Sequence, residues 1–83
     1  MPVAYVLISV DVGAEREVLN SLKTFPEVAE AYIVYGVYDL VAKIVVERQE
    51  ELMEVVSDKI RKLEKVRSTL TMMAVEGFER EKS

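Results

Sequence analysis

The order of apolar segments constrains the fold of this chain more than any other feature. Four short runs are rich in β-branched residues, as expected of strands: residues 3–10, 28–35, 40–47 and 67–75. Two segments between them, 14–25 and 49–63, repeat apolar residues at helical spacing. The resulting order is βαββαβ, which predicts an α+β, ferredoxin-like fold with a four-stranded antiparallel sheet.

Each helical segment carries a single apolar stripe. In the first segment, Val18, Leu22 and Phe25 share one face. Pro26 ends that helix, because proline disfavours helical geometry in the residue before it. The second stripe comprises Leu52, Val55, Val56, Ile60 and Leu63. One stripe per helix predicts that both helices lie on the same face of the sheet.

The uncovered face of the predicted sheet is also apolar. Alternation along the strands separates two sets, neither of them strongly polar: Tyr5, Leu7, Tyr32, Val34, Leu70 and Met72 against Val6, Ile8, Ile33, Ile44, Met73 and Val75. A monomer would leave one set in water as a larger apolar patch than soluble monomers usually tolerate. We therefore expect a second copy to cover the open face, which gives a homodimer of the dimeric α+β barrel type.

The inventory of reactive side chains is small. The 83 residues make one domain, expected over 1–76, with a charged C-terminal tail at 77–83. The sequence contains no cysteine and no histidine, which removes the thiolate nucleophile, the usual general base and the usual zinc ligands. No Asp or Glu pair has metal-ligand spacing, and Gly36 is not part of a glycine-rich phosphate loop. We expect no metal, no cofactor and no enzymatic activity.

Charge and hydropathy limit the classes of binding partner and the cellular location that we expect. The net charge of −4 opposes binding to a phosphate backbone, so direct nucleic-acid binding is not expected. The first strand begins at Val3, which leaves no room for a signal peptide, and no apolar run approaches 18 residues. A cytoplasmic location without membrane association is expected. One Asn and one Gln beside abundant Glu and Lys are typical of hyperthermophilic proteins.

The segment from Tyr35 to Asp39 is the one unusual motif. As a plain hairpin loop, it would use Gly36 for a positive φ and Asp39 to bond its own backbone, while the tyrosines pack. As a binding site, its amides would hold an α-carboxylate, Asp39 an α-ammonium, and the rings would flank the side chain of the ligand. The sequence leaves both interpretations open.

A second cluster, Arg67 to Thr71, places hydroxyl groups at the start of an otherwise apolar strand. These hydroxyls are consistent with a solvent-exposed edge of the sheet, or with hydrogen bonds to a ligand or to another subunit. Met72 and Met73 fit core packing, because methionine fills irregular gaps.

The pattern VYGVYDLVAK from Val34 to Lys43, with RSTLTM after it, resembles the effector-binding (RAM, or AsnC-type regulatory) domain of Lrp/AsnC transcription regulators. The likeness spans residues 4–75, and its most recognisable mark is Gly-x-x-Asp at Gly36 and Asp39. In that family an amino acid binds where this loop meets neighbouring subunits, and dimers assemble further, commonly into octamers. The resemblance therefore implies a set of ligand-binding residues: Gly36, Val37, Tyr38, Asp39, Leu40, Thr69 and Thr71.

Members of that family usually carry an N-terminal helix-turn-helix domain, whereas the sheet here begins at residue 3. We expect a stand-alone domain that senses an amino acid, apolar or aromatic rather than charged. It would act by assembling with itself or with a full-length DNA-binding relative. Two alternatives stay open: an ACT-like ferredoxin-fold interaction module with another ligand or none, and a small enzyme of the dimeric α+β barrel kind. Such enzymes usually place a histidine or an acid between sheet and helices.

Overall fold

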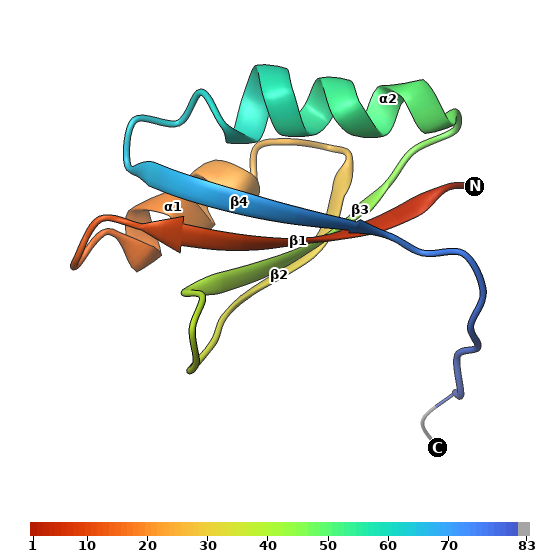
Figure 1. Ribbon diagram of the computed structural model, residues 1–83, viewed down its shortest axis with the longest axis horizontal. Coiled ribbons are helices and arrows are strands. Elements are labelled where there is room, and N and C mark those ends of the chain that lie inside the picture. The colour runs from red at the N-terminus through yellow and green to blue at the C-terminus, as the bar shows by residue number, and fades with distance from the viewer. Residues whose placement is uncertain (82–83) are drawn as a thin grey trace.

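The computed structural model describes residues 1–81 and has the expected order of elements (Figure 1). The strands are β1 (Val3–Val10), β2 (Val28–Ile33), β3 (Leu40–Val45) and β4 (Val66–Met73). The helices are α1 (Glu15–Leu22) and α2 (Gln49–Glu54), and a π-helical segment, η1 (Val55–Ile60), continues α2. None of the helices described in residues 1–81 is long and apolar enough to cross a membrane. The βαββαβ order predicted from the sequence is confirmed.

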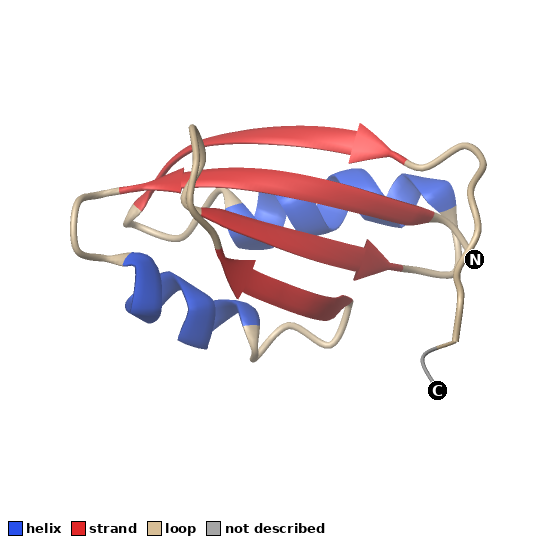
Figure 2. Cartoon of the chain, turned by 90° about the horizontal axis from the view of Figure 1, so that it is seen from below, coloured by secondary structure: helices blue, strands red, loops and turns tan. Residues whose placement is uncertain are grey.

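The four strands form one antiparallel sheet with the order β2-β3-β1-β4. The central strand β1 pairs on one side with β3, where Val6 faces Ala42, and on the other with β4, where Val6 faces Thr71. Both helices lie on one side of this sheet (Figures 1 and 2). The ferredoxin-like architecture expected from the sequence is therefore confirmed.

The core lies between the helices and one face of the sheet. Alternate residues of β1 and β3 are buried there, and they pack against α1, α2 and η1: Ala4, Val6, Ile8, Val10, Leu40, Ala42, Ile44, Val18, Leu22, Leu52, Val55, Val56 and Ile60. The residues between them point to the opposite side, here called the open face: Tyr5, Leu7, Tyr32, Val41, Lys43, Leu70 and Met72. The predicted placement of Tyr5 and Leu7 opposite Val6 and Ile8 is confirmed.

The second strand departs from strict alternation. Its register against β3 shifts between Val28 and Glu30, because Ala29 forms a bulge. Val28 consequently packs against the core together with Ala31, whereas strict alternation along the strand would put Val28 on the same face as Glu30. A single extra residue in a strand reverses the face of every residue beyond it.

Element ends also differ from the sequence-based boundaries. The first helix ends at Leu22 rather than Phe25, because the amides of Thr24 and Phe25 bond the carbonyls three residues earlier and tighten the last turn. The expected helix over 49–63 becomes π-helical at η1, where the Arg61 amide bonds the Val56 carbonyl at 2.8 Å. The last strand ends at Met73, so Val75, which the alternation grouped with Val6 and Ile8, lies beyond the strand and is exposed.

One ion pair joins η1 to the start of β2. The ammonium of Lys59 lies 2.9 Å from both carboxylate oxygens of Glu27 and 5.7 Å from the centre of the Phe25 ring. The hydrogen bond from Lys59 lowers the pKa of Glu27 below its ordinary value of 4.5. This pair therefore stabilises the packing of η1 against the chain just before β2.

Glu27→Gln is expected to lower the free energy of unfolding by roughly 0.5 kcal/mol at neutral pH, since the pair is partly exposed. A carboxyl group whose pKa is lowered on folding stabilises the protein above its unfolded pKa. That contribution disappears as the pH falls through the lowered pKa. Urea unfolding from pH 7 to pH 3 measures the difference, which should vanish at the acid end.

The matched control is Glu64→Gln, because Glu64 is exposed and forms no ion pair within the described part of the chain. Equal pH profiles for the two variants would contradict a stabilising role of the Glu27–Lys59 pair.

Candidate functional site

The loop between β2 and β3 lies at the end of the sheet where β1 finishes (Figure 1). Gly36 has a φ of 151°, a conformation that side chains disfavour, although nothing lies within 4 Å of a Cβ built there. Gly36 is therefore required by the backbone conformation rather than by a lack of space. The loop thus holds a shape that most residues at this position would strain.

The tip of the loop is exposed. Tyr35 and Val37 are exposed in full or nearly so, and Tyr38 is half-buried. The amides of residues 35–38 donate no hydrogen bond to any group of residues 1–81. The loop therefore presents consecutive free backbone donors beside two tyrosines, as the binding-site interpretation requires.

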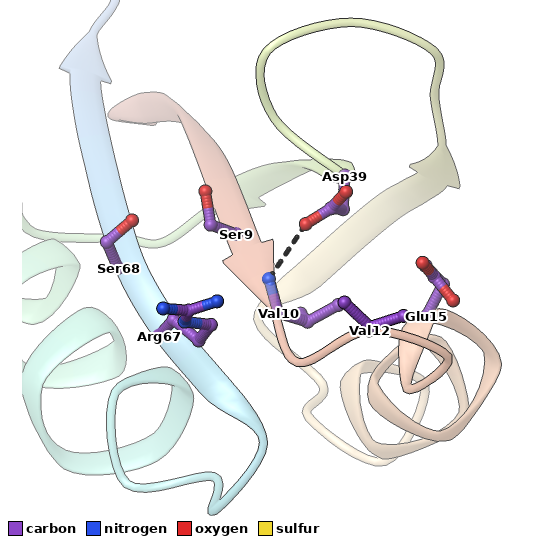
Figure 3. Close-up of a pocket in the computed structure, with 7 residues that line it drawn as sticks. All are labelled: Ser9, Val10, Val12, Glu15, Asp39, Arg67 and Ser68. Atoms are coloured by element: carbon purple, nitrogen blue, oxygen red, sulfur yellow. Dashed lines mark hydrogen bonds between the residues drawn. The ribbon is translucent and has the colours of Figure 1, made fainter.

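Asp39 anchors this loop to β1. Its carboxylate oxygen Oδ2 accepts a hydrogen bond of 2.9 Å from the Val10 amide (Figure 3). Its own amide donates to the Ile8 carbonyl, also at 2.9 Å. Its carbonyl accepts a third bond from the Val34 amide. The expectation that a structural Asp39 bonds its own backbone is wrong, because the partner of its side chain lies 29 residues away. The other carboxylate oxygen accepts no hydrogen bond from residues 1–81.

Two open hollows flank Asp39. The first, called the sheet-end hollow, has a volume of about 550 Å³ and is lined by Ser9, Val10, Val12, Glu15, Asp39, Arg67 and Ser68. The second, called the loop hollow, has a volume of about 520 Å³ and is lined by Gly13, Glu15, Arg16, Ile33, Val34, Tyr35, Gly36 and Asp39. Asp39 and Glu15 border both hollows. Each hollow therefore combines two carboxylates with one guanidinium group.

The charges around the sheet-end hollow are not paired with one another. Figure 3 shows Arg67 on one side of the hollow and Glu15 on the other, with Asp39 beside the end of β1. Within residues 1–81, none of these three side chains forms an ion pair. Such separated charges of opposite sign suit a ligand that carries both an ammonium and a carboxylate group.

The residues implied by the family resemblance do not all meet in one chain. Gly36 and Asp39 line the loop hollow. The side chain of Leu40 is fully buried in the core, so only its backbone can face a ligand. Thr69 and Thr71 pair with Ile8 and Val6, which places both hydroxyls on the helix side of the sheet, and Thr69 lines a separate hollow.

Three polar residues at the sheet-end hollow were not predicted as ligand contacts: Ser9, Glu15 and Arg67. Ser68 belongs to the hydroxyl cluster for which the sequence left a ligand contact open. Arg67 reaches the hollow because the β1–β4 register shifts between Ser9 and Val10, so that Arg67 has no partner between Ser68 and Val66. Ser9 and Ser68 face each other across that pair of strands. Their shared side of the sheet could have been found from alternation, but the bulge that frees Arg67 could not.

Metal binding has no support in the described residues. Across residues 1–81, no group of three or more Asp or Glu side chains is arranged to hold a metal ion. Asp39 and Glu15 are accompanied by Arg67, whose positive charge would oppose a cation. The side chains at this site offer hydrogen bonds and charges of both signs.

Comparison with known proteins places this geometry in a family. The sequence profile of the Lrp/AsnC ligand binding domain matches residues 3–83. The HTH-type transcriptional regulator FL11 of Pyrococcus furiosus is 38% identical over 72 residues, which are 87% of this chain and 47% of FL11. The chain thus spans about half the length of this relative.

Solved structures agree with that assignment. The crystal structure of FFRP-DM1 is 41% identical, with a TM-score of 0.87, and the match covers 90% of this chain and 100% of that one. The transcriptional regulator NMB0573 of Neisseria meningitidis, solved as a complex with L-Met, has a TM-score of 0.84 at 16% identity. That match covers 95% of this chain and 53% of the regulator, and it shows the shared fold. FL11 and NMB0573 are transcriptional regulators, and the chain belongs to the Lrp/AsnC family as a regulatory ligand-binding domain.

Proposed function

We propose that this domain senses an amino acid that binds beside Asp39 and biases the assembly of its copies. The observation that carries the proposal is the corner formed by Asp39 between two open hollows. One oxygen of its carboxylate is fixed to β1, and the other accepts no hydrogen bond from the described residues. A zwitterion fits this corner, because negatively charged carboxylates and a positively charged guanidinium both face it.

Each end of an amino acid has a partner at this corner. Its ammonium would lie against Asp39 and Glu15, the two carboxylates that border both hollows. Its carboxylate would accept hydrogen bonds from the free amides of the loop or from the guanidinium of Arg67. The neighbouring valines, Val10 and Val12, offer an apolar surface to an apolar side chain. The L-Met in the complex of the Neisseria meningitidis regulator agrees with such a ligand.

The ligand contacts come from more than one chain in this proposal. Gly36, Val37, Tyr38 and Asp39 would contact the ligand from the loop, and Leu40 through its backbone. Thr69 and Thr71 would be supplied by a neighbouring subunit, since they lie on the helix side of their own sheet. Both hollows are open, so a single chain encloses a ligand incompletely. A site completed by a second chain favours the assembly that completes it.

The open face supplies the first step of assembly in this proposal. Tyr5, Tyr32, Leu70 and Met72 are 40% to 56% exposed in one chain, and they lie on the same side of the sheet. Packing two such faces together gives a homodimer, and dimers would assemble further, to an octamer or together with a full-length DNA-binding relative. The apolar character of this face supports the dimer.

Leu70→Glu is expected to convert the dimer to a monomer, because the new carboxylate would be buried without a partner between two apolar faces. Sedimentation equilibrium measures the mass, and circular dichroism checks the fold. Met53→Glu is the matched control, since Met53 is an exposed methionine on the outer side of α2. A Leu70→Glu variant that stays dimeric would place the interface elsewhere.

A thermal-shift and light-scattering screen of the twenty amino acids at millimolar concentration tests the sensing proposal. A ligand at ten times its dissociation constant stabilises the folded protein by about 1.4 kcal/mol. For a domain of this size, that raises the melting temperature by roughly 5–10 °C. The same ligand should change the mass of the assembly. Twenty flat responses would contradict amino-acid sensing and favour an interaction module without an amino-acid ligand.

Asp39→Asn is expected to weaken binding of the amino acid found in that screen at least thirtyfold, roughly 2 kcal/mol, because the ammonium loses its counter-charge. The asparagine oxygen can still accept the Val10 amide, so the fold should persist. Asp39→Ala removes that acceptor and should also lower the free energy of unfolding by about 1–2 kcal/mol. Calorimetric titration and urea unfolding separate the two effects.

Asp11→Asn is the control for a general loss of negative charge, because Asp11 lies next to Val10 and its side chain forms no hydrogen bond within residues 1–81. Unchanged affinity in Asp39→Asn would move the site away from this corner.

A further inference from the structure

We propose that residues 74–81, here called the C-terminal arm, form part of the contact with a second copy of this chain. In this arrangement Val75 and Phe78 pack against the partner, while Glu79 neutralises Lys43 on the face that the partner covers. The proposal rests on the proposed dimer through the open face. It adds that the C-terminal arm takes part in the contact and that Glu79 has to pair with Lys43 there.

The arm leaves β4 on the side of the sheet away from α2 (Figure 1). Its first residue is held to β1 by a hydrogen bond of 2.9 Å from the Ala74 amide to the Val3 carbonyl. Beyond that point, residues 75–81 form no backbone hydrogen bond with the described residues. The arm borders a hollow of about 570 Å³ together with Met1, Pro2, Val3, Tyr5 and Lys43. It therefore extends the edge of the open face without being covered by its own chain.

The two largest apolar side chains of the arm have almost no cover. Val75 is 97% exposed and Phe78 is 80% exposed. The only described partner of the Phe78 ring is the guanidinium of Arg80, 5.1 Å from the ring centre. Aromatic side chains with an exposed ring beside an apolar surface are typical of contacts between proteins.

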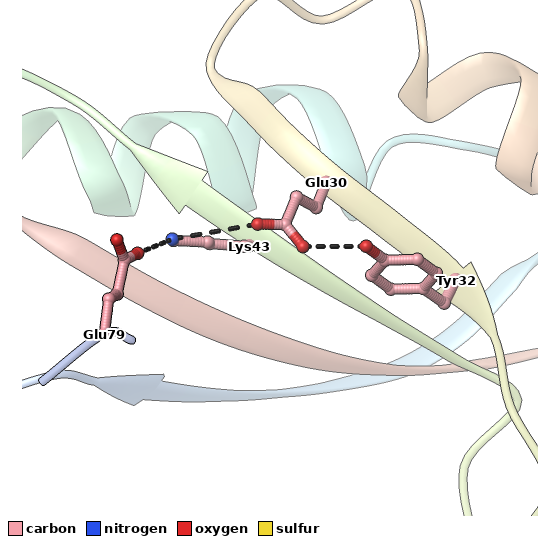
Figure 4. Close-up of polar contacts among 4 residues, drawn as sticks. All are labelled: Glu30, Tyr32, Lys43 and Glu79. Atoms are coloured by element: carbon pink, nitrogen blue, oxygen red, sulfur yellow. Dashed lines mark hydrogen bonds and ion pairs between the residues drawn. The ribbon is translucent and has the colours of Figure 1, made fainter. Parts of the chain in front are cut away.

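Lys43 is a charged residue on the open face, and it is paired from two sides (Figure 4). Its ammonium lies 3.1 Å from a Glu79 oxygen and 3.8 Å from a Glu30 oxygen, and only 18% of its side chain is exposed. The Tyr32 hydroxyl donates a hydrogen bond of 2.8 Å to Glu30, which orients that carboxylate. The nearby Glu79 carboxylate raises the pKa of Lys43 above 10.5, so the side chain stays charged.

A charged ammonium can be covered by an apolar surface only when a carboxylate accompanies it. Glu30 on β2 supplies one carboxylate at 3.8 Å, and Glu79 from the arm supplies the closer one at 3.1 Å. The arm therefore stays in place when a partner covers Lys43, because the closer carboxylate comes from the arm. A second copy is the occupant that fits, because its face offers the same apolar residues and its own arm. In a two-fold symmetric dimer, each open face is then in contact with two arms, one from its own chain and one from the partner.

The test measures the dimer dissociation constant of Phe78→Ser by sedimentation at a series of dilutions. We expect an increase of at least tenfold, because an aromatic side chain leaves the interface. The matched control is Met53→Ser, since Met53 is an exposed apolar residue on α2, which covers the opposite side of the sheet from the open face. That control should stay within twofold of the unchanged chain.

Charge pairing is tested by a double-mutant cycle. Glu79→Gln alone should weaken the dimer at least threefold, whereas the same change in a Lys43→Met background should have no effect, because the charge that needs a partner is gone. Equal effects in both backgrounds would overturn the role of Glu79.

Comparison of the variants distinguishes a failure of the arm contact from a failure of the face-to-face dimer. A Phe78→Ser dimer of unchanged affinity, with Leu70→Glu monomeric, would overturn the arm contact and leave the face-to-face dimer standing. If Leu70→Glu also stays dimeric, the face-to-face dimer itself fails. An arm that packs only on its own face would make Phe78→Ser destabilise the Leu70→Glu monomer. We expect no change in the stability of that monomer.

Discussion

The sheet is apolar on both faces, and the chain supplies helices for only one of them. Burial of alternate residues of β1 and β3 under α1, α2 and η1 fixes the register of the sheet, because a slip by one residue would move the core set into water. The same alternation directs a second, largely apolar set to the other side. The exposed apolar face follows from this imbalance, and the ammonium of Lys43 on that face is accompanied by two carboxylates.

Most of the fold could be predicted from the sequence, since strand and helix periods differ clearly and the glycines and prolines mark the turns. What escaped prediction depends on single residues. The bulge at Ala29 turns Val28 toward the core, and neither alanine nor valine at these positions indicates that a bulge forms. The change from α to π geometry at Val55 is likewise invisible in a stripe that keeps Val55, Val56 and Ile60 on one side. Local irregularities of this kind are decided by packing across elements.

The candidate site was only partly predictable for a related reason. Gly36 and Asp39 stand out in the sequence, but the partner of the Asp39 carboxylate is the Val10 amide, and no local pattern links the two. Arg67 and Glu15 come from segments on either side of Asp39 in space and far from it along the chain. Thr69 and Thr71, implied by resemblance, face the helices of their own chain. Whether they reach a ligand depends on contacts between chains, which one sequence cannot specify.

The hydrogen bond between Val10 and Asp39 has a consequence for the thermodynamics of recognition. It ties the loop to the central strand before any ligand is present, while Gly36 holds the loop in a conformation that most residues disfavour. A loop restrained in this way loses little conformational entropy when it is occupied, so more of the interaction energy remains as affinity. The carboxylate that would meet an ammonium also belongs to the framework of the sheet. Occupancy at this corner would therefore be transmitted directly to β1, which pairs with both of its neighbours.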